Sequence, residues 1–134
     1  TYKLPRPMID SKNFDFSFSG LKTAVANLAN TPGMKCDLAA SIEQAIVDVL
    51  VTKTIRSAMK YKIKNIMVAG GVAANQKLTS ELRIKSAELR INLHIPPPNL
   101  CTDNGAMIAS AAFFLKPIKD PLGVQANSNL SLDY

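Results

Sequence analysis

The sequence has one histidine, His94, and no tryptophan among its 134 residues. A single imidazole excludes a metal site built from several histidines within this chain. Because His94 falls in a predicted strand just before three prolines, we interpret it as a structural or surface residue rather than a catalytic one. Two cysteines, Cys36 and Cys101, are too few for a disulfide scaffold, and neither belongs to a CxxC pair. We therefore expect both thiols to be reduced, as in cytosolic proteins.

Long hydrophobic runs are also missing, although the apolar fraction of 47% is ordinary for a globular protein. The longest run, residues 105–115, is interrupted by Ser110, and a membrane-spanning helix needs about 20 apolar residues. Residues 1–10 contain no apolar core of a signal peptide. These absences predict a cytoplasmic protein with no membrane partner; in a eukaryotic source, mitochondria would also fit.

Acidic residues are scarce in one stretch of this basic chain, whose formal net charge is +6. Residues 49–80 contain no Asp or Glu, and the basic side chains there are those of Lys53, Arg56, Lys60, Lys62, Lys64 and Lys77. Cations near a helix C-terminus are favourable by themselves, so a solvated helix end explains the run. A surface that contacts nucleic-acid phosphates explains it equally well, and both interpretations stay open.

Hydrophobic periodicity predicts strands that alternate with helices. We expect strands over residues 14–19, 65–69 and 91–95, helices over 21–29, 38–60, 75–90 and 106–115, and a turn cluster at 30–33. The helix over 38–60 is apolar on much of its circumference, which predicts a central, largely buried helix with Asp37 as its N-cap. This order indicates an α/β layer with parallel strands. So few strands for so many helices suggest one lobe of a larger α/β protein.

Two glycines, Gly70 and Gly71, lie between a predicted strand and a predicted helix. Glycines let the backbone approach a ligand closely, and the following helix N-terminus favours phosphate. The segment matches neither GxGxxG nor a P-loop, so a tight turn without a ligand remains an alternative. Asn75 would either cap the next helix or bond to a ribose or base.

A second loop, residues 100–106, also precedes a predicted helix. Asp103 in this loop would either cap the helix or act as an oxygen ligand for a cation. The sequence contains no GxSxG elbow and no HExxH motif, which leaves no obvious nucleophile or zinc-peptidase signature.

Three stretches together resemble one protein family. They are residues 15–23 (DFSFSGLKT), 69–75 (AGGVAAN) and 101–109 (CTDNGAMIA). In this order and spacing they are similar to the TsaD family, the tRNA threonylcarbamoyladenosine synthesis subunit formerly called O-sialoglycoprotein endopeptidase or glycoprotease. The resemblance implies an actin-like, sugar-kinase-like (ASKHA) fold of two α/β lobes. Residues 1–134 correspond to its C-terminal part only, without the N-terminal lobe.

The resemblance also implies site residues and chemistry. Asp103 matches the family's aspartate ligand for one divalent metal, iron or zinc, whose two histidine ligands form an upstream HxxxH motif that this chain lacks. Asn75 matches an asparagine that contacts the nucleotide-type substrate, threonylcarbamoyl-adenylate or ATP, and Gly70 and Gly71 match the adjacent turn. The implied reaction transfers threonylcarbamoyl from the adenylate to the exocyclic amine of the adenosine beside the tRNA anticodon. The implied partners are tRNA and other subunits of the synthesis complex.

Other functions stay open at this point. One is the older assignment as a metal-dependent O-sialoglycoprotein endopeptidase, and another is a non-catalytic module that binds nucleotide or protein partners. A relationship to sugar or acetate kinases is a further alternative, which the TDNGA stretch disfavours. No side chain here is an obvious general base, and we expect this chain alone to be inactive.

Overall fold

A computed structural model describes residues 2–29, 35–116, 119–123 and 125–126 of the chain. The turn cluster predicted at residues 30–33 lies outside these residues. The chain divides into two compact units, Thr1–Thr102 and Asp103–Tyr134, and each is described by itself.

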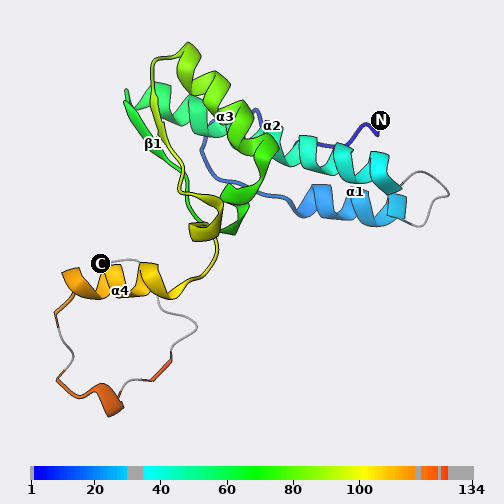
Figure 1. The fold of residues 1–134 in the computed structure, drawn as a ribbon. Coiled ribbons are helices and arrows are strands. Elements are labelled where there is room, and N and C mark those ends of the chain that lie inside the picture. The colour runs from blue at the N-terminus through cyan, green and yellow to red at the C-terminus, as the bar shows by residue number, and fades with distance from the viewer. Residues whose placement is uncertain (1, 30–34, 117–118, 124, 127–134) are drawn as a thin grey trace. The chain divides into compact units, whose positions relative to one another are not determined.

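The first unit alternates helices with two short strands (Figure 1). Strands β1 (Asn65–Met67) and β2 (Asn92–His94) pair in parallel, with Asn65 opposite Asn92 and Met67 opposite His94. The α-helices of this unit are α1 (Ser19–Ala29), α2 (Lys35–Lys60) and α3 (Gln76–Glu88), and two 3₁₀-helices are η1 (Gly71–Ala74) and η2 (Pro98–Leu100). The predicted α/β class and the parallel pairing are therefore confirmed.

The strand predicted over residues 14–19 is wrong. Residues 14–18 pair with no strand in the described part of the chain, and Ser19 already begins α1. The carbonyl oxygens of this segment and its flank accept side-chain hydrogen bonds instead: Asp15 O from Lys53 Nζ and Asn13 O from Arg56. The apolar–polar alternation thus belongs to an extended segment that packs along α2. Such a segment has the period-2 pattern of a strand but forms no backbone hydrogen bonds with a neighbouring strand.

Helix α2 is the central, largely buried helix that the sequence predicts, and it packs against both α1 and α3. It begins at Lys35, so Asp37 lies in the first turn and the prediction of Asp37 as N-cap is wrong. Helix α2 contributes to two hydrophobic clusters. One joins the middle of α2 to α3 and contains Val47, Val51, Leu78 and Leu82. The other joins Ala45 of α2 to Leu21 of α1 and to Leu4 of the N-terminal segment.

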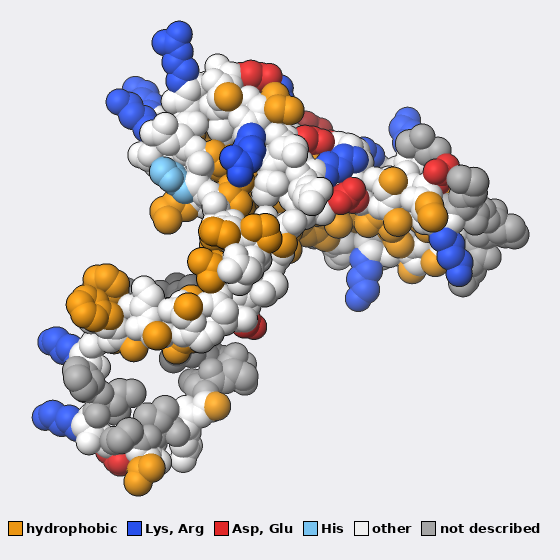
Figure 2. Space-filling model, in the orientation of Figure 1, with side chains coloured by type: hydrophobic (Ala, Val, Ile, Leu, Met, Phe, Trp, Pro, Cys, Tyr) orange, Lys and Arg blue, Asp and Glu red, His pale blue; other side chains and the backbone are white. Residues whose placement is uncertain are grey.

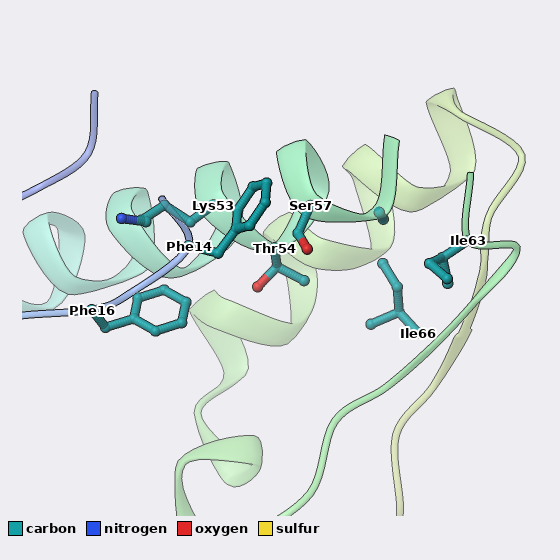
Figure 3. A pocket seen from close by; sticks show the side chains of 8 residues that line it. Phe14, Phe16, Lys53, Thr54, Ser57, Ile63 and Ile66 are labelled. Carbon is teal, nitrogen blue, oxygen red and sulfur yellow. The ribbon is translucent and has the colours of Figure 1, made fainter. Parts of the chain in front are cut away.

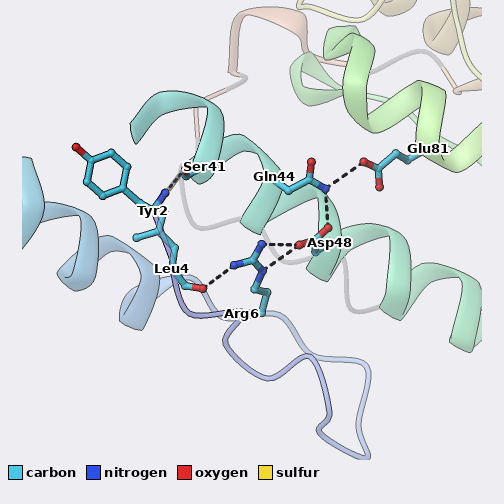
Figure 4. A network of polar contacts seen from close by, with 7 residues as sticks. All are labelled: Tyr2, Leu4, Arg6, Ser41, Gln44, Asp48 and Glu81. Atoms are coloured by element: carbon cyan, nitrogen blue, oxygen red, sulfur yellow. Dashed lines mark hydrogen bonds and ion pairs between the residues drawn. The ribbon is translucent and has the colours of Figure 1, made fainter. Parts of the chain in front are cut away.

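A polar network fastens the N-terminal segment to α2 and α2 to α3 (Figure 4). Arg6 forms an ion pair with Asp48 at 2.8 Å and also donates to the carbonyl oxygen of Leu4 at 2.7 Å. Gln44 donates from one amide nitrogen to Asp48 at 2.7 Å and to Glu81 of α3 at 3.2 Å. These bonds hold the N-terminal segment and α3 against the middle of α2.

The second unit contains α4 (Gly105–Phe114) and a 3₁₀-helix, η3 (Pro121–Gly123). Helix α4 confirms the predicted small-residue helix within one residue at each end. The described helices include none with the combined length and hydropathy of a transmembrane span. Both cysteines are unbridged, as expected, with Cys36 exposed and Cys101 buried.

Candidate functional site

The Gly70–Gly71 turn follows the last backbone bond of the sheet, which Val68 N donates to His94 O at 3.0 Å. Gly70 has φ 87° and ψ 172°, a conformation that side-chain-bearing residues rarely adopt. Its carbonyl oxygen accepts from Ala73 N at 2.9 Å and so begins η1. A Cβ atom at either glycine would meet no heavy atom within 4 Å. The turn therefore needs a glycine at Gly70 for its backbone, and both glycines face open space in which a ligand has room.

Asn75 caps α3, and its amide also reaches across to α2. Its Oδ1 accepts from Leu78 N at 2.8 Å, while its Nδ2 donates to Glu43 Oε1 at 2.7 Å. The capping role left open by the sequence is thus confirmed. An amide has two donor hydrogens and two acceptor lone pairs, so one of each remains for a ligand. The two protein bonds hold that free donor and acceptor in a fixed orientation.

A cavity of about 410 Å³ lies between α2 and the η1–α3 segment. Its walls are apolar except for Glu43 and Asn75, and the other lining residues are Ala39, Ile42, Ile46, Val47, Leu50, Val72 and Leu78. Sites for small molecules and cofactors commonly have about this size and this mixture of apolar walls with a few polar groups. The sequence patterns did not identify Glu43 as a site residue. An acidic residue next to Ile42, Ile46 and Val47, on a helix predicted to be buried, could have indicated a carboxylate with a specific partner.

Asp103 belongs to the second unit, so it is not described together with Gly70, Gly71 and Asn75. It is exposed and does not cap α4, because Asn104 Oδ1 accepts the bond from Met107 N at 2.9 Å. The interpretation of Asp103 as a helix cap is therefore wrong. Within the described ranges, no hydrogen bond or ion pair engages its carboxylate.

Among the described residues, no group of three or more His, Cys, Asp or Glu is arranged to hold a metal ion. The exposed carboxylate of Asp103 fits one oxygen ligand of such a centre, since hard oxygen donors are common metal ligands. The remaining ligands would have to come from residues outside those described.

The basic side chains of residues 49–64 fall into two groups, one buried or engaged within the protein and the other exposed. Lys53 is completely buried, and its Nζ donates to Met8 O at 3.0 Å, to Ser11 Oγ at 2.8 Å and to Asp15 O. Arg56 donates to the carbonyl oxygens of Ile9 and Ser11 at 3.0 and 2.8 Å. For these two side chains the phosphate-contact interpretation is wrong, because their donors already hold the N-terminal segment.

Lys53 also borders a second pocket, of about 260 Å³, beside Phe14 and Phe16 (Figure 3). Phe14 stacks obliquely on Tyr61, and Lys60 lies over both rings at 5.1 and 5.5 Å from their centroids. The aromatic side chains of the N-terminal segment are thus held against the second half of α2 by cations as well as by apolar contacts.

Comparison with known proteins gives a family match over most of the chain. The profile described as "TsaD: tRNA N6-adenosine threonylcarbamoyltransferase" matches residues 1–110. Similar proteins named tRNA N6-adenosine threonylcarbamoyltransferase occur in Paracidovorax citrulli (50% identical, over 83% of this chain and 33% of the relative) and in Latilactobacillus sakei (44%, over 100% and 41%). The relative from Geobacillus thermodenitrificans is 46% identical over 96% of this chain and 40% of its own length. The chain therefore spans about a third to two-fifths of these relatives.

Proposed function

Since the chain belongs to the TsaD family, we propose that the complete protein is a tRNA N6-adenosine threonylcarbamoyltransferase to which this chain contributes the C-terminal part. The names of the relatives support transfer to tRNA rather than peptidase activity. The α/β unit with parallel strands is compatible with one lobe of an actin-like, sugar-kinase-like (ASKHA) enzyme of two lobes. In such an enzyme the reaction takes place between the lobes.

The donor substrate, threonylcarbamoyl-adenylate or the ATP from which an adenylate is made, would bind at Gly70, Gly71 and Asn75. The observation that carries this assignment is the apolar cavity of about 410 Å³ beside the fixed amide of Asn75. An adenine ring is flat and largely apolar, with hydrogen-bonding groups at its edge. The cavity supplies apolar walls, and Asn75 supplies one free donor and one free acceptor.

The proposed reaction is an acyl transfer. The exocyclic amine of the adenosine beside the tRNA anticodon attacks the carbamoyl carbonyl carbon, a C–N bond forms, and the C–O bond to the phosphate of AMP breaks. The amine loses one proton, and AMP leaves with the bonding electron pair. Asp103 would be one ligand of a divalent iron or zinc ion, which when bound supplies a Lewis acid.

The partners of the complete enzyme would be tRNA and the other subunits of the threonylcarbamoyladenosine synthesis complex, and its location would be the cytoplasm. Family membership supports tRNA directly through the names of the relatives. The remaining subunits are proposed because the activated acyl donor must be supplied by another enzyme.

The test uses the complete protein with the adenylate donor and tRNA, and it measures both modified adenosine and released AMP. We expect equal amounts of the two products, and no product from residues 1–134 alone. Cleavage of a sialoglycoprotein without modification of tRNA would overturn the proposal.

A further inference from the structure

Helix α2 ends in a turn in which a lysine occupies a position that usually requires glycine. Ile63 N donates to Ala58 O at 2.8 Å, and Lys62 N donates to Met59 O at 3.2 Å. These two bonds form the Schellman motif, in which the residue just past the helix end is left-handed and most often glycine. Here that residue is Lys62, with φ 55°.

Helix α3 ends in the same motif. Ile91 N donates to Ser86 O at 2.8 Å, Arg90 N donates to Ala87 O at 3.1 Å, and Arg90 has φ 56°. A left-handed backbone is strained for a residue with a side chain, and such strain tends to persist where a side chain has a function. In both helices the left-handed residue just past the helix end is basic, Lys62 after α2 and Arg90 after α3.

The pairing of the strands brings the two turns to one edge. Because β1 and β2 are parallel, both turns lie at the amino ends of the strands, and Asn92 N donates to Lys64 O at 2.8 Å. Lys62, Lys64 and Arg90 are exposed, and together we call them the basic edge. Figure 2 shows Lys and Arg side chains projecting from this part of the molecule, where α2 and α3 end.

Acidic residues do little to neutralise the basic edge. The sequence from residue 49 to residue 80 contains none. Glu88, two residues before Arg90, is already engaged by Lys85 at 3.0 Å. Lysine is depleted at the centres of protein–protein interfaces, whereas exposed Lys and Arg are the usual partners of nucleic-acid phosphates.

We propose that the basic edge binds the phosphodiester backbone of the tRNA substrate. This inference rests on the proposed function, since it takes tRNA as the substrate. Residues 64–70 separate the edge from the Gly70–Gly71 turn, and an extended segment of that length spans about 20 Å. A tRNA whose reacting adenosine lies near the turn is long enough to place backbone phosphates at the edge as well.

The decisive variant is Lys62→Gly combined with Arg90→Gly in the complete protein. Glycine removes the charge and also removes the left-handed strain, so we expect an equal or higher melting temperature. A decrease in RNA binding then has no origin in misfolding. The plot of log affinity against log salt concentration should become shallower by about one unit for each phosphate that the variant no longer neutralises, hence by about two units.

Two controls accompany this variant. Lys3→Ala with Lys35→Ala removes the same number of exposed charges beside the first half of α2 and should leave the salt slope unchanged. Lys62→Arg with Arg90→Lys keeps both charges and should keep the slope of the unsubstituted protein. If the glycine variant lowers the melting temperature, Lys62→Asn with Arg90→Asn serves instead, because asparagine tolerates this backbone.

The outcomes separate this inference from the proposed function. An unchanged salt slope in a glycine or asparagine variant that still modifies tRNA overturns the proposal that the basic edge binds tRNA. The proposed function would then stand. A shallower slope in the glycine variant, in a case where the unsubstituted protein binds tRNA but transfers no threonylcarbamoyl, supports tRNA binding by the basic edge and overturns the proposed function. Release of a protein subunit from the complex, with tRNA affinity unchanged, also overturns the inference.

Discussion

The Nδ2 atom of Asn75 donates to the Oε1 atom of Glu43 over 2.7 Å, and this bond joins residues 32 positions apart in the sequence. The same side chain caps α3 through its Oδ1 atom. One amide therefore fixes the start of α3 against the first half of α2, at the polar end of the 410 Å³ cavity.

The first prediction concerns this amide. Asn75→Ala removes the cap and the bond to Glu43, and it should destabilise α3 by about 1–2 kcal/mol. Asn75→Ser keeps a capping oxygen and should recover most of that stability, but it should still weaken binding of the adenylate. Hydrogen exchange of the α3 amides and titration with the donor measure the two effects. Equal donor affinity in all three proteins would remove Asn75 from the substrate site.

The two glycines should respond differently to alanine. Gly70→Ala forces a side chain into φ 87° and should cost about 1–2 kcal/mol of stability. Gly71→Ala has no such strain and no atom within 4 Å of the new Cβ, so the free energy of unfolding should change little. If the donor approaches this backbone closely, Gly71→Ala will nevertheless raise KM for the adenylate. An unchanged KM would mean that Gly71 serves the turn alone.

Lys53 and Lys60 offer a matched comparison of a buried and an exposed lysine on one helix. Lys53→Met leaves the oxygens of Met8, Ser11 and Asp15 without their donor, which should destabilise the protein by about 2–4 kcal/mol. Lys60→Met should cost no more than about 1 kcal/mol, because an exposed cation–π contact with Phe14 and Tyr61 contributes about 0.5–1 kcal/mol. Denaturant unfolding of both variants measures the difference, and similar values for the two would contradict the internal role of Lys53.

The metal prediction separates Asp103 from its neighbour. Asp103→Ala in the complete protein should lower metal content and transfer activity without loosening α4, because Asn104 provides the cap. Asn104→Ala should do the reverse, with metal content retained and α4 destabilised by about 1 kcal/mol. Elemental analysis and hydrogen exchange distinguish the two variants. Full metal content in the Asp103 variant would show that its carboxylate is no ligand.

Local sequence patterns predicted most elements because the responsible interactions are local. The spacing of apolar residues located α2, helical composition located α3, and a run of small residues located α4. Asn75, one of whose two possible roles was capping, lies at the start of α3. The same kind of evidence failed at residues 14–18, where an alternating pattern lacks a neighbouring strand in the described part of the chain. Local composition favoured Asp103 as a possible cap, whereas the structure uses Asn104, since the choice depends on the backbone angles of the loop.

The sequence by itself determined the helices, the parallel α/β class, the family and the run of basic residues. Tertiary structure decided what each basic residue does. Lys53 meets oxygens from a segment 38 to 45 positions away and becomes internal, whereas Lys62 emerges at a strained turn and stays in water. The two side chains are chemically identical. Because the N-terminal segment packs against α2, Lys53 is buried and donates structural hydrogen bonds. Within the described part of the chain, Lys62 has no such neighbour and remains available to an anionic partner.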